Sequence, residues 1–215
     1  MKKLLALLPA FLMLFMVSCG DSDDPTPTPP SPTPDKTYLQ ILREDVNTIL
    51  TKYPAWKKES DKDYPFGYFR EADYVLNGFV SDLPVSEIKA VSVVYGFDYT
   101  TLLPEEQQHI LEATRDFTKG LDADMTYQTY DGTGYPLDVA IIQNLDKIIS
   151  LEHAIKNLKE SNVVIPRTTK VSLCYPSVPH FDRAIIYRFG LSTPQDDVQV
   201  WVNAETGEVK TTPTH

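Results

Sequence analysis

The chain has 215 residues, a formal net charge of −10 at pH 7 and 42% hydrophobic residues. This length is enough to bury the core of one domain or of two small ones. The excess of acidic residues argues against nucleic acid as a partner and against binding to an anionic membrane surface. The two cysteines, Cys19 and Cys174, cannot form an intrachain disulfide if Cys19 carries a lipid.

The first 18 residues have the composition of a bacterial signal peptide. Lys2 and Lys3 precede an almost unbroken apolar run over residues 4–17, which suits a signal-peptide core and is too short to span a membrane. Ser18 and Cys19 follow, and this segment resembles the bacterial lipobox. The resemblance implies cleavage before the cysteine, which becomes the lipid-modified first residue. The alternative is an ordinary secretory signal with an incidental cysteine.

Residues 19–35 are predicted to form the lipid anchor and a stalk. The acidic cluster over residues 20–24 is similar to the surface-export signal of Bacteroidota lipoproteins, although a plain solvated tether has the same composition. Residues 25–34 contain six of the 17 prolines, which is typical of a polyproline-II stalk about 30 Å long. We therefore expect an outer-membrane lipoprotein exposed at the cell surface, with a periplasm-facing anchor as the alternative.

An N-terminal α+β region is predicted over residues 36–145. Apolar residues at helical spacing indicate a helix over residues 37–53, which Pro54 ends. Residues 88–95 are rich in β-branched side chains and indicate a strand. Residues 69–80 fit either a strand or a short helix.

The second half of this region predicts one more helix and a hairpin. The helix covers residues 104–120, with Pro104 at its first position and Gly120 at its end. Residues 125–130 and 137–142 are predicted to be two strands that an Asp-Gly-Thr-Gly turn connects.

Residues 146–215 predict a helix followed by three strands. Ser150 is the expected N-cap, and Glu152 suits the positive end of the helix dipole. One apolar stripe identifies the buried side of this helix: Leu151, Ala154, Ile155 and Leu158. Residues 204–207 form a tight turn in which Gly207 supplies a positive φ, and residues 208–211 form the return strand.

Two of these strands show strict alternation. In residues 183–189, Ile185, Tyr187 and Phe189 share one face. In residues 197–203, the valines share one face, and Gln199 and Trp201 share the other.

The C-terminal pattern resembles the PepSY family, which opens on a helix like "isleeAi", continues with a strand that carries a Tyr, and closes on a "v.vDa.TGev" hairpin. Residues 149–155, Tyr187 and residues 202–209 match these three parts, with Asn203 where the family has Asp. The resemblance implies a non-enzymatic domain that binds or inhibits other proteins, as in the propeptides of secreted proteases. The fold class is α+β, with helices packed on an antiparallel sheet. A further hypothesis is that the middle of the chain is a diverged copy of the same unit.

The candidate binding residues are aromatic or lie beside an aromatic residue: Trp201, Gln199, Tyr187 and Trp56. If helices cover the valine face of the last long strand, Trp201 lies on an open face and offers a platform for a protein or a sugar ring. The alternative is that both faces of the sheet are covered.

No catalytic signature or metal-binding motif is present in the sequence. Cys174, His180 and Asp182 contain the residue types of a nucleophile and its base, but a small buried strand residue explains Cys174 equally well. Asp122 and Asp124 resemble half of a calcium loop without its glycine and closing glutamate. We therefore predict no enzymatic activity, no catalytic residues, no metal and no cofactor.

The sequence as a whole predicts a lipid-anchored protein of the cell envelope that binds another protein. A protease that it inhibits or regulates is one such partner. The alternative function is that of a surface glycan-binding accessory lipoprotein, which would use the same aromatic residues. Neither hypothesis involves nucleic acid.

Overall fold

The computed structural model describes residues 36–57, 66–98, 109–131, 142, 144–175, 184–190 and 200–211. All of them belong to one compact unit, Ser31–His215. The predicted signal peptide, the stalk and Cys19 lie outside the described residues.

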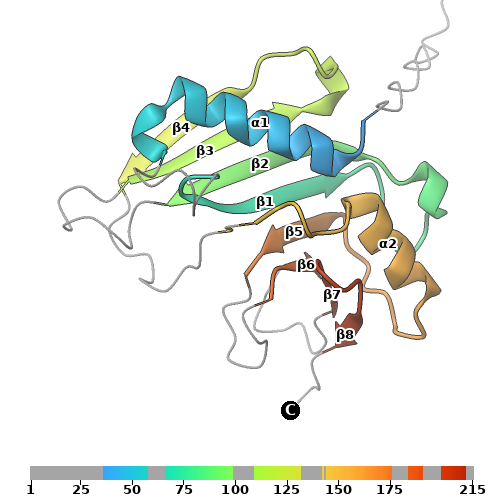
Figure 1. Ribbon diagram of the computed structural model, residues 1–215. Helices are drawn as coiled ribbons and strands as arrows, with labels where there is room; N and C mark the ends of the chain where they lie inside the picture. Colours follow the sequence, from blue (N-terminus) through green and yellow to red (C-terminus); the bar gives the residue numbers. More distant parts are fainter. Residues whose placement is uncertain are drawn as a thin grey trace, which may run out of the picture. The chain divides into compact units, whose positions relative to one another are not determined.

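The described part of the chain forms an eight-stranded sheet in the order β4-β3-β2-β1-β5-β6-β7-β8 (Figure 1), and every neighbouring pair is antiparallel. The strands are β1 (Phe69–Leu76), β2 (Ala90–Asp98), β3 (His109–Asp116), β4 (Thr126–Asp131), β5 (Lys170–Cys174), β6 (Ile186–Phe189), β7 (Val200–Asn203) and β8 (Val209–Thr211). The α-helices are α1 (Tyr38–Lys52) and α2 (Leu151–Glu160). The predicted α+β class with an antiparallel sheet is confirmed.

One order of elements occurs twice in the described residues. The helix α1 precedes strands β1 to β4, and the helix α2 precedes strands β5 to β8. The two sets of strands join at the centre of the sheet, where β1 pairs with β5 through Ala72 opposite Leu173 and Tyr74 opposite Val171. The sheet is therefore continuous across residue 145, where the sequence suggested a boundary between two regions.

Both helices begin at a side-chain cap, and Ser150 is the cap that the sequence predicted. The Thr37 hydroxyl accepts from the backbone N–H of Gln40, whose side chain accepts in return from the Thr37 N–H at 2.9 Å. The Ser150 hydroxyl accepts from the His153 N–H at 3.3 Å. These bonds satisfy backbone donors that have no partner within the helix.

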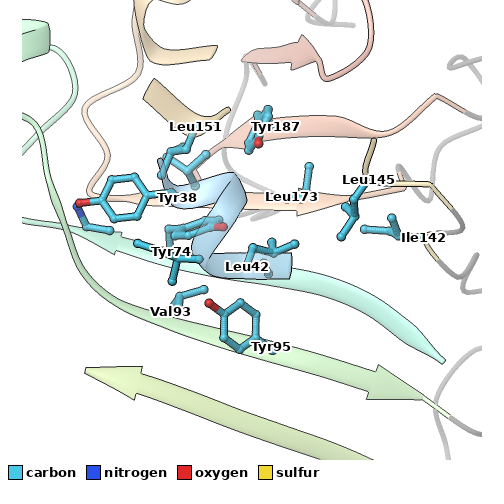
Figure 2. Packing of buried hydrophobic residues seen from close by; sticks show 14 of the residues in the cluster. Tyr38, Leu42, Tyr74, Val93, Tyr95, Ile142, Leu145, Leu151, Leu173 and Tyr187 are labelled. Carbon is cyan, nitrogen blue, oxygen red and sulfur yellow. The ribbon is translucent and has the colours of Figure 1, made fainter. Parts of the chain in front are cut away.

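Both helices pack against the same face of the sheet and share one hydrophobic core (Figure 2). Tyr38 and Leu42 of α1, Leu151 of α2, and Tyr74 and Tyr187 of the sheet all belong to this core. Each fully buried apolar side chain of this size contributes about 1.5–3 kcal/mol. The helices also meet directly, because Glu152 Oε1 accepts from the Tyr38 N–H at 3.0 Å.

The predicted helix over residues 104–120 is wrong in the part that the structure describes. His109–Asp116 is strand β3, which pairs with β2 on one side and with β4 on the other. Leu111 and Ala113 alternate onto the core face, and pairing on both sides satisfies the backbone of the strand as fully as a helix would. Phe117–Lys119 forms a single 3-10 turn before Gly120.

Residues 69–80, which fitted a strand or a helix, contain strand β1. The first strand of the predicted hairpin is confirmed as β4, and its partner is β3, with Ala113 opposite Tyr127. Most of the predicted second strand, over residues 137–142, lies outside the described residues, although the Ile142 N–H donates to the Phe69 carbonyl at 2.9 Å.

The closing turn of the chain matches its prediction. The Asn203 side-chain oxygen accepts from the N–H groups of Glu205 and Thr206, both at 2.9 Å, and Gly207 has a φ of 75°. Asn157 of α2 donates to the Gly207 carbonyl at 3.1 Å. Asparagine therefore holds this turn through its side-chain oxygen, an acceptor that aspartate also possesses.

Candidate interaction face of the sheet

The sheet has a second face, opposite to the one that α1 and α2 cover. Side chains alternate between the two faces of a strand, so the residues between the core residues of β1 to β4 point away from the helices. We call this surface the polar face. Its exposed and half-buried residues are Glu71, Asp73, Val75, Ser92, Val94, Glu112, Thr114, Asp116, Thr126, Gln128 and Tyr130, and Gly96 and Ile110 are buried on the same face.

The register arranges the polar face in rows across four strands. Gly96 lies between Glu71 and Glu112, and Glu112 lies opposite Gln128. In the next row, Val94 lies between Asp73 and Thr114. The floor of the face is thus built from small side chains, and carboxylates stand on β1 and β3 at either side of β2.

Gly96 makes room for an ion pair above the sheet. A Cβ atom added to it would lie 3.1 Å from Glu71 Cγ and 3.6 Å from an Arg70 nitrogen, which is the close approach that a glycine inside a strand often marks. Arg70 and Glu71 form a salt bridge there. Burial raises the pKa of the Glu71 carboxyl, and the Arg70 guanidinium opposes that rise.

Tyr130 is the exposed aromatic residue of the polar face, with 42% of its surface accessible. Its hydroxyl lies 2.9 Å from Glu112 Oε2 and also contacts the side-chain oxygen of Gln128. Sequence reasoning missed this site. The alternation of residues 126–131 showed that Tyr130 shares a face with Thr126 and Gln128, but it did not show which face the helices cover.

The expectation that Trp201 lies on an open face is wrong. Only 1% of its surface is accessible, and it packs in a small cluster with Cys174 and Ile186. The predicted alternation is correct, since Val200 and Val202 join the main core on the other face. The alternative interpretation, in which this part of the sheet is covered on both faces, therefore holds at Trp201.

The other predicted binding residues do not gather into one surface either. Tyr187 is buried on the core face, and its hydroxyl donates to the Ile149 carbonyl at 2.9 Å. Trp56 ends the 3-10 turn Pro54–Trp56 and is 6% accessible. Gln199 lies outside the described residues.

Cys174 is a buried thiol at the end of β5. Burial raises its pKa to about 12, with an opposing effect from the Arg188 guanidinium, so the unreactive thiol form predominates at neutral pH. His180 and Asp182 lie outside the described residues.

The two aspartates of the half calcium loop, Asp122 and Asp124, are exposed in the turn that precedes β4. In the described ranges, no three His, Cys, Asp or Glu residues are grouped so that they could hold a metal ion.

A buried ion pair connects α1 to the sheet. Arg115 of β3 donates to both oxygens of Asp45, from Nε at 2.5 Å and from Nη2 at 2.6 Å. The Tyr95 hydroxyl donates to the same carboxylate at 2.7 Å. The hydrogen bond to Asp45 raises the pKa of Arg115, and burial raises the pKa of Tyr95 well above its ordinary value.

Comparisons with known proteins do not place the chain in a family. No protein-family model matches it, and no curated protein matches it. Among solved structures, the crystal structure of a "putative lipoprotein" from Clostridium difficile 630 aligns with 83% of this chain and 100% of its own, at a TM-score of 0.40 and 13% identity. No helix among the described residues is long and apolar enough to cross a membrane.

Proposed function

We propose that this chain is a non-enzymatic, lipid-anchored protein of the cell envelope that binds another protein through the polar face. The anchor follows from the N-terminal sequence, where a signal-peptide core ends at Ser18 and Cys19 and a proline-rich stalk follows. In this proposal Cys19 carries the lipid in the outer membrane, and the stalk holds the folded unit at the cell surface.

The observation that best supports the binding function is that a helix covers only one face of the N-terminal half of the sheet. In Figure 1, α1 lies across β1 to β4 on one side of the sheet, and its apolar side chains complete the core there. On the other side, Asp73, Thr126, Gln128 and Tyr130 remain exposed. A four-strand surface with an exposed tyrosine has the residue types that protein interfaces use as anchors.

A protein partner suits this surface better than a glycan does. The glycan-binding alternative relied on Trp56, Trp201 and the tyrosines as stacking surfaces, and both tryptophans and Tyr187 are buried. The resemblance of about residues 149–210 to the PepSY family adds a partner class, because such domains occur in the propeptides of secreted proteases and are proposed to bind or inhibit other proteins. We therefore infer that a protease of the envelope or the secreted fraction is a partner of this chain.

Affinity capture tests the proposal. The compact unit Ser31–His215 would be immobilised, detergent-solubilised native envelope would be passed over it, and bound proteins would be identified by mass spectrometry. The proposal predicts one reproducibly enriched protein, and inhibition would be measured if that protein is a protease. An eluate that matches the eluate from a blank support would refute the binding function.

A further inference from the structure

Among the described residues, the polar face has more acidic than basic side chains. Four carboxylates of the described residues with placed side chains belong to it, those of Glu71, Asp73, Glu112 and Asp116, and Asp116 forms a salt bridge with Lys119. Arg70 compensates Glu71 through their salt bridge. Within the described part of the chain, neither Asp73 nor Glu112 forms an ion pair, and the hydrogen-bond partner of Glu112 is the neutral hydroxyl of Tyr130.

We propose that the polar face recognises a protein segment that presents lysine or arginine side chains to Asp73 and Glu112. This inference rests on the proposed binding function and adds the chemistry of the partner to it. Each carboxylate would accept charge-assisted hydrogen bonds from a cationic side chain, and these are stronger than bonds between neutral groups.

The floor between the two carboxylates suits such side chains. Asp73 is on β1 and Glu112 is on β3, and β2 separates them with Val94 and Gly96. Neighbouring strands lie about 4.8 Å apart, so β1 and β3 are about 10 Å apart. The aliphatic stem of a lysine or an arginine can lie along small side chains while its charged end reaches a carboxylate.

The charge of the second face changes sign along the sheet. In the half formed by β5 to β8, the charged residues on this side are Lys170, Arg188 and Lys210. Ser172 and Trp201 are buried there, whereas Asp73, Thr126, Gln128 and Tyr130 are exposed on the side formed by β1 to β4. Electrostatic complementarity therefore selects a basic segment over β1 to β4 and disfavours an acidic one.

Tyr130 adds an ordered contact beside the carboxylates. Its hydroxyl lies against Glu112 and Gln128, so its ring is held in place before a partner arrives. A partner then loses less conformational entropy on binding than it would against a mobile side chain.

Three synthetic peptides would probe this surface. They share an extended sequence of about twelve residues and differ only in having Lys, Glu or Ser at alternate positions, because alternate side chains of an extended segment share one face. We expect the Lys peptide to bind the unit Ser31–His215 and to shift amide resonances of β1 to β4. The inference is overturned if the Lys peptide binds no better than the Ser peptide, or if the shifts lie elsewhere.

Charge-reversal variants distinguish the effect of the polar face on peptide affinity from the effect of the protein's net charge. Asp73→Lys with Glu112→Lys should weaken binding of the Lys peptide by at least about tenfold. The matched control changes Glu87→Lys and Glu205→Lys, two exposed residues off this face, and should change affinity by less than about twofold. Equal losses in both double variants would attribute the effect to overall charge. Asp73→Lys alone, at an exposed position, keeps the test valid if the double variant does not fold.

The same variants distinguish this inference from the proposed function. A captured envelope protein that loses affinity for the face variant, but not for the control variant, supports both. A captured protein that binds both variants equally leaves the binding function standing and overturns the inference. Dimerisation of the unit that the face variant abolishes would assign the face to a second copy of the chain, which also overturns it.

Discussion

Asp45 is a carboxylate on the buried side of α1, with 4% of its surface accessible. Removing such a charge from water costs several kcal/mol, which only a close partner can offset. Arg115 supplies two short hydrogen bonds and directs its remaining group to the carbonyls of Leu121 and Ala123. The pair therefore ties α1, β3 and the turn before β4 together.

Asp45→Asn should destabilise the fold by about 3–5 kcal/mol, because it leaves the Arg115 guanidinium without its counter-charge in a buried site. Urea unfolding followed by circular dichroism measures this loss. The control is Glu44→Gln on the exposed side of the same helix, where the ion pair with Lys36 is open to solvent and is worth less than about 1 kcal/mol. Similar midpoints for the two variants would show that the buried pair does not stabilise the fold.

The buried thiol of Cys174 should make the free energy of unfolding depend on pH in the alkaline range. Its pKa is about 12 in the folded protein, against an ordinary value of 9.0. Above pH 9 the unfolded chain loses this proton and the folded chain keeps it, so stability is full below pH 9 and falls as pH rises toward 12. We expect the free energy of unfolding of Ser31–His215 to decrease between pH 8 and pH 10.

Cys174→Ala should flatten that decrease, since the unit Ser31–His215 contains no other cysteine. The buried thiol should also fail to react with a thiol reagent at pH 8 until the protein is unfolded. Rapid labelling of the native protein, or an unchanged pH slope in the variant, would contradict this description of Cys174.

Trp201 shows which properties of a single residue can be predicted from the sequence and which cannot. Alternation in its strand correctly separated the valines from Trp201, because the period of a strand is a local property. Whether a second layer covers the opposite face depends on contacts from elsewhere in the chain, so the burial of Trp201 was not predictable. Asp45 was missed for a related reason, since its partners lie on strands β2 and β3.

At the scale of elements, both helices were predictable because their signals are local. Thr37 and Ser150 cap them, and each has an apolar stripe at helical spacing. Strand β3 was not predictable, because the composition of residues 109–116 permits a helix or a strand. Pairing with β2 and β4 decides that they form a strand. Long-range pairing of this kind overrides local propensity.

Two turns, the closing turn at Gly207 and the turn at Gly120 before β4, provide a matched pair of glycine variants. Gly207→Ala and Gly120→Ala both place a Cβ on a backbone with positive φ, of 75° and 94°, at a cost of about 1–2 kcal/mol each. The Cβ at Gly207 would also meet the Asn157 amide, whereas nothing lies within 4 Å at Gly120. Thermal unfolding should therefore show a loss for Gly207→Ala that is larger by about 1 kcal/mol. Equal losses would mean that the contact with Asn157 contributes nothing.

At the scale of the whole molecule, the α+β class followed from the order of predicted helices and strands. The sequence did not predict that all the described strands join into one sheet, because this depends on β1 pairing with β5 about 100 residues later in the chain. The polar face is a product of that architecture. It exists because α1 and α2 pack on the same side of the sheet, and helical periodicity cannot tell which side a helix will take.

One substitution tests the proposed lipid anchor. Cys19→Ala should move the protein from the membrane pellet to the soluble fraction, because no lipid can then be attached, and labelled fatty acid should no longer be incorporated. Cys174→Ala serves as the control and should remain in the pellet. A Cys19→Ala protein that stays in the membrane fraction would refute the lipid anchor.

Site-specific photo-crosslinking in the native envelope tests the binding function most directly. A photoreactive amino acid would replace Gln128 on the polar face or, as the control, Thr48 on the exposed side of α1. We expect irradiation to give a discrete protein adduct from position 128 and none from position 48. An adduct from position 48 alone, or none from either position, would contradict the conclusion that a partner binds the helix-free face of this sheet.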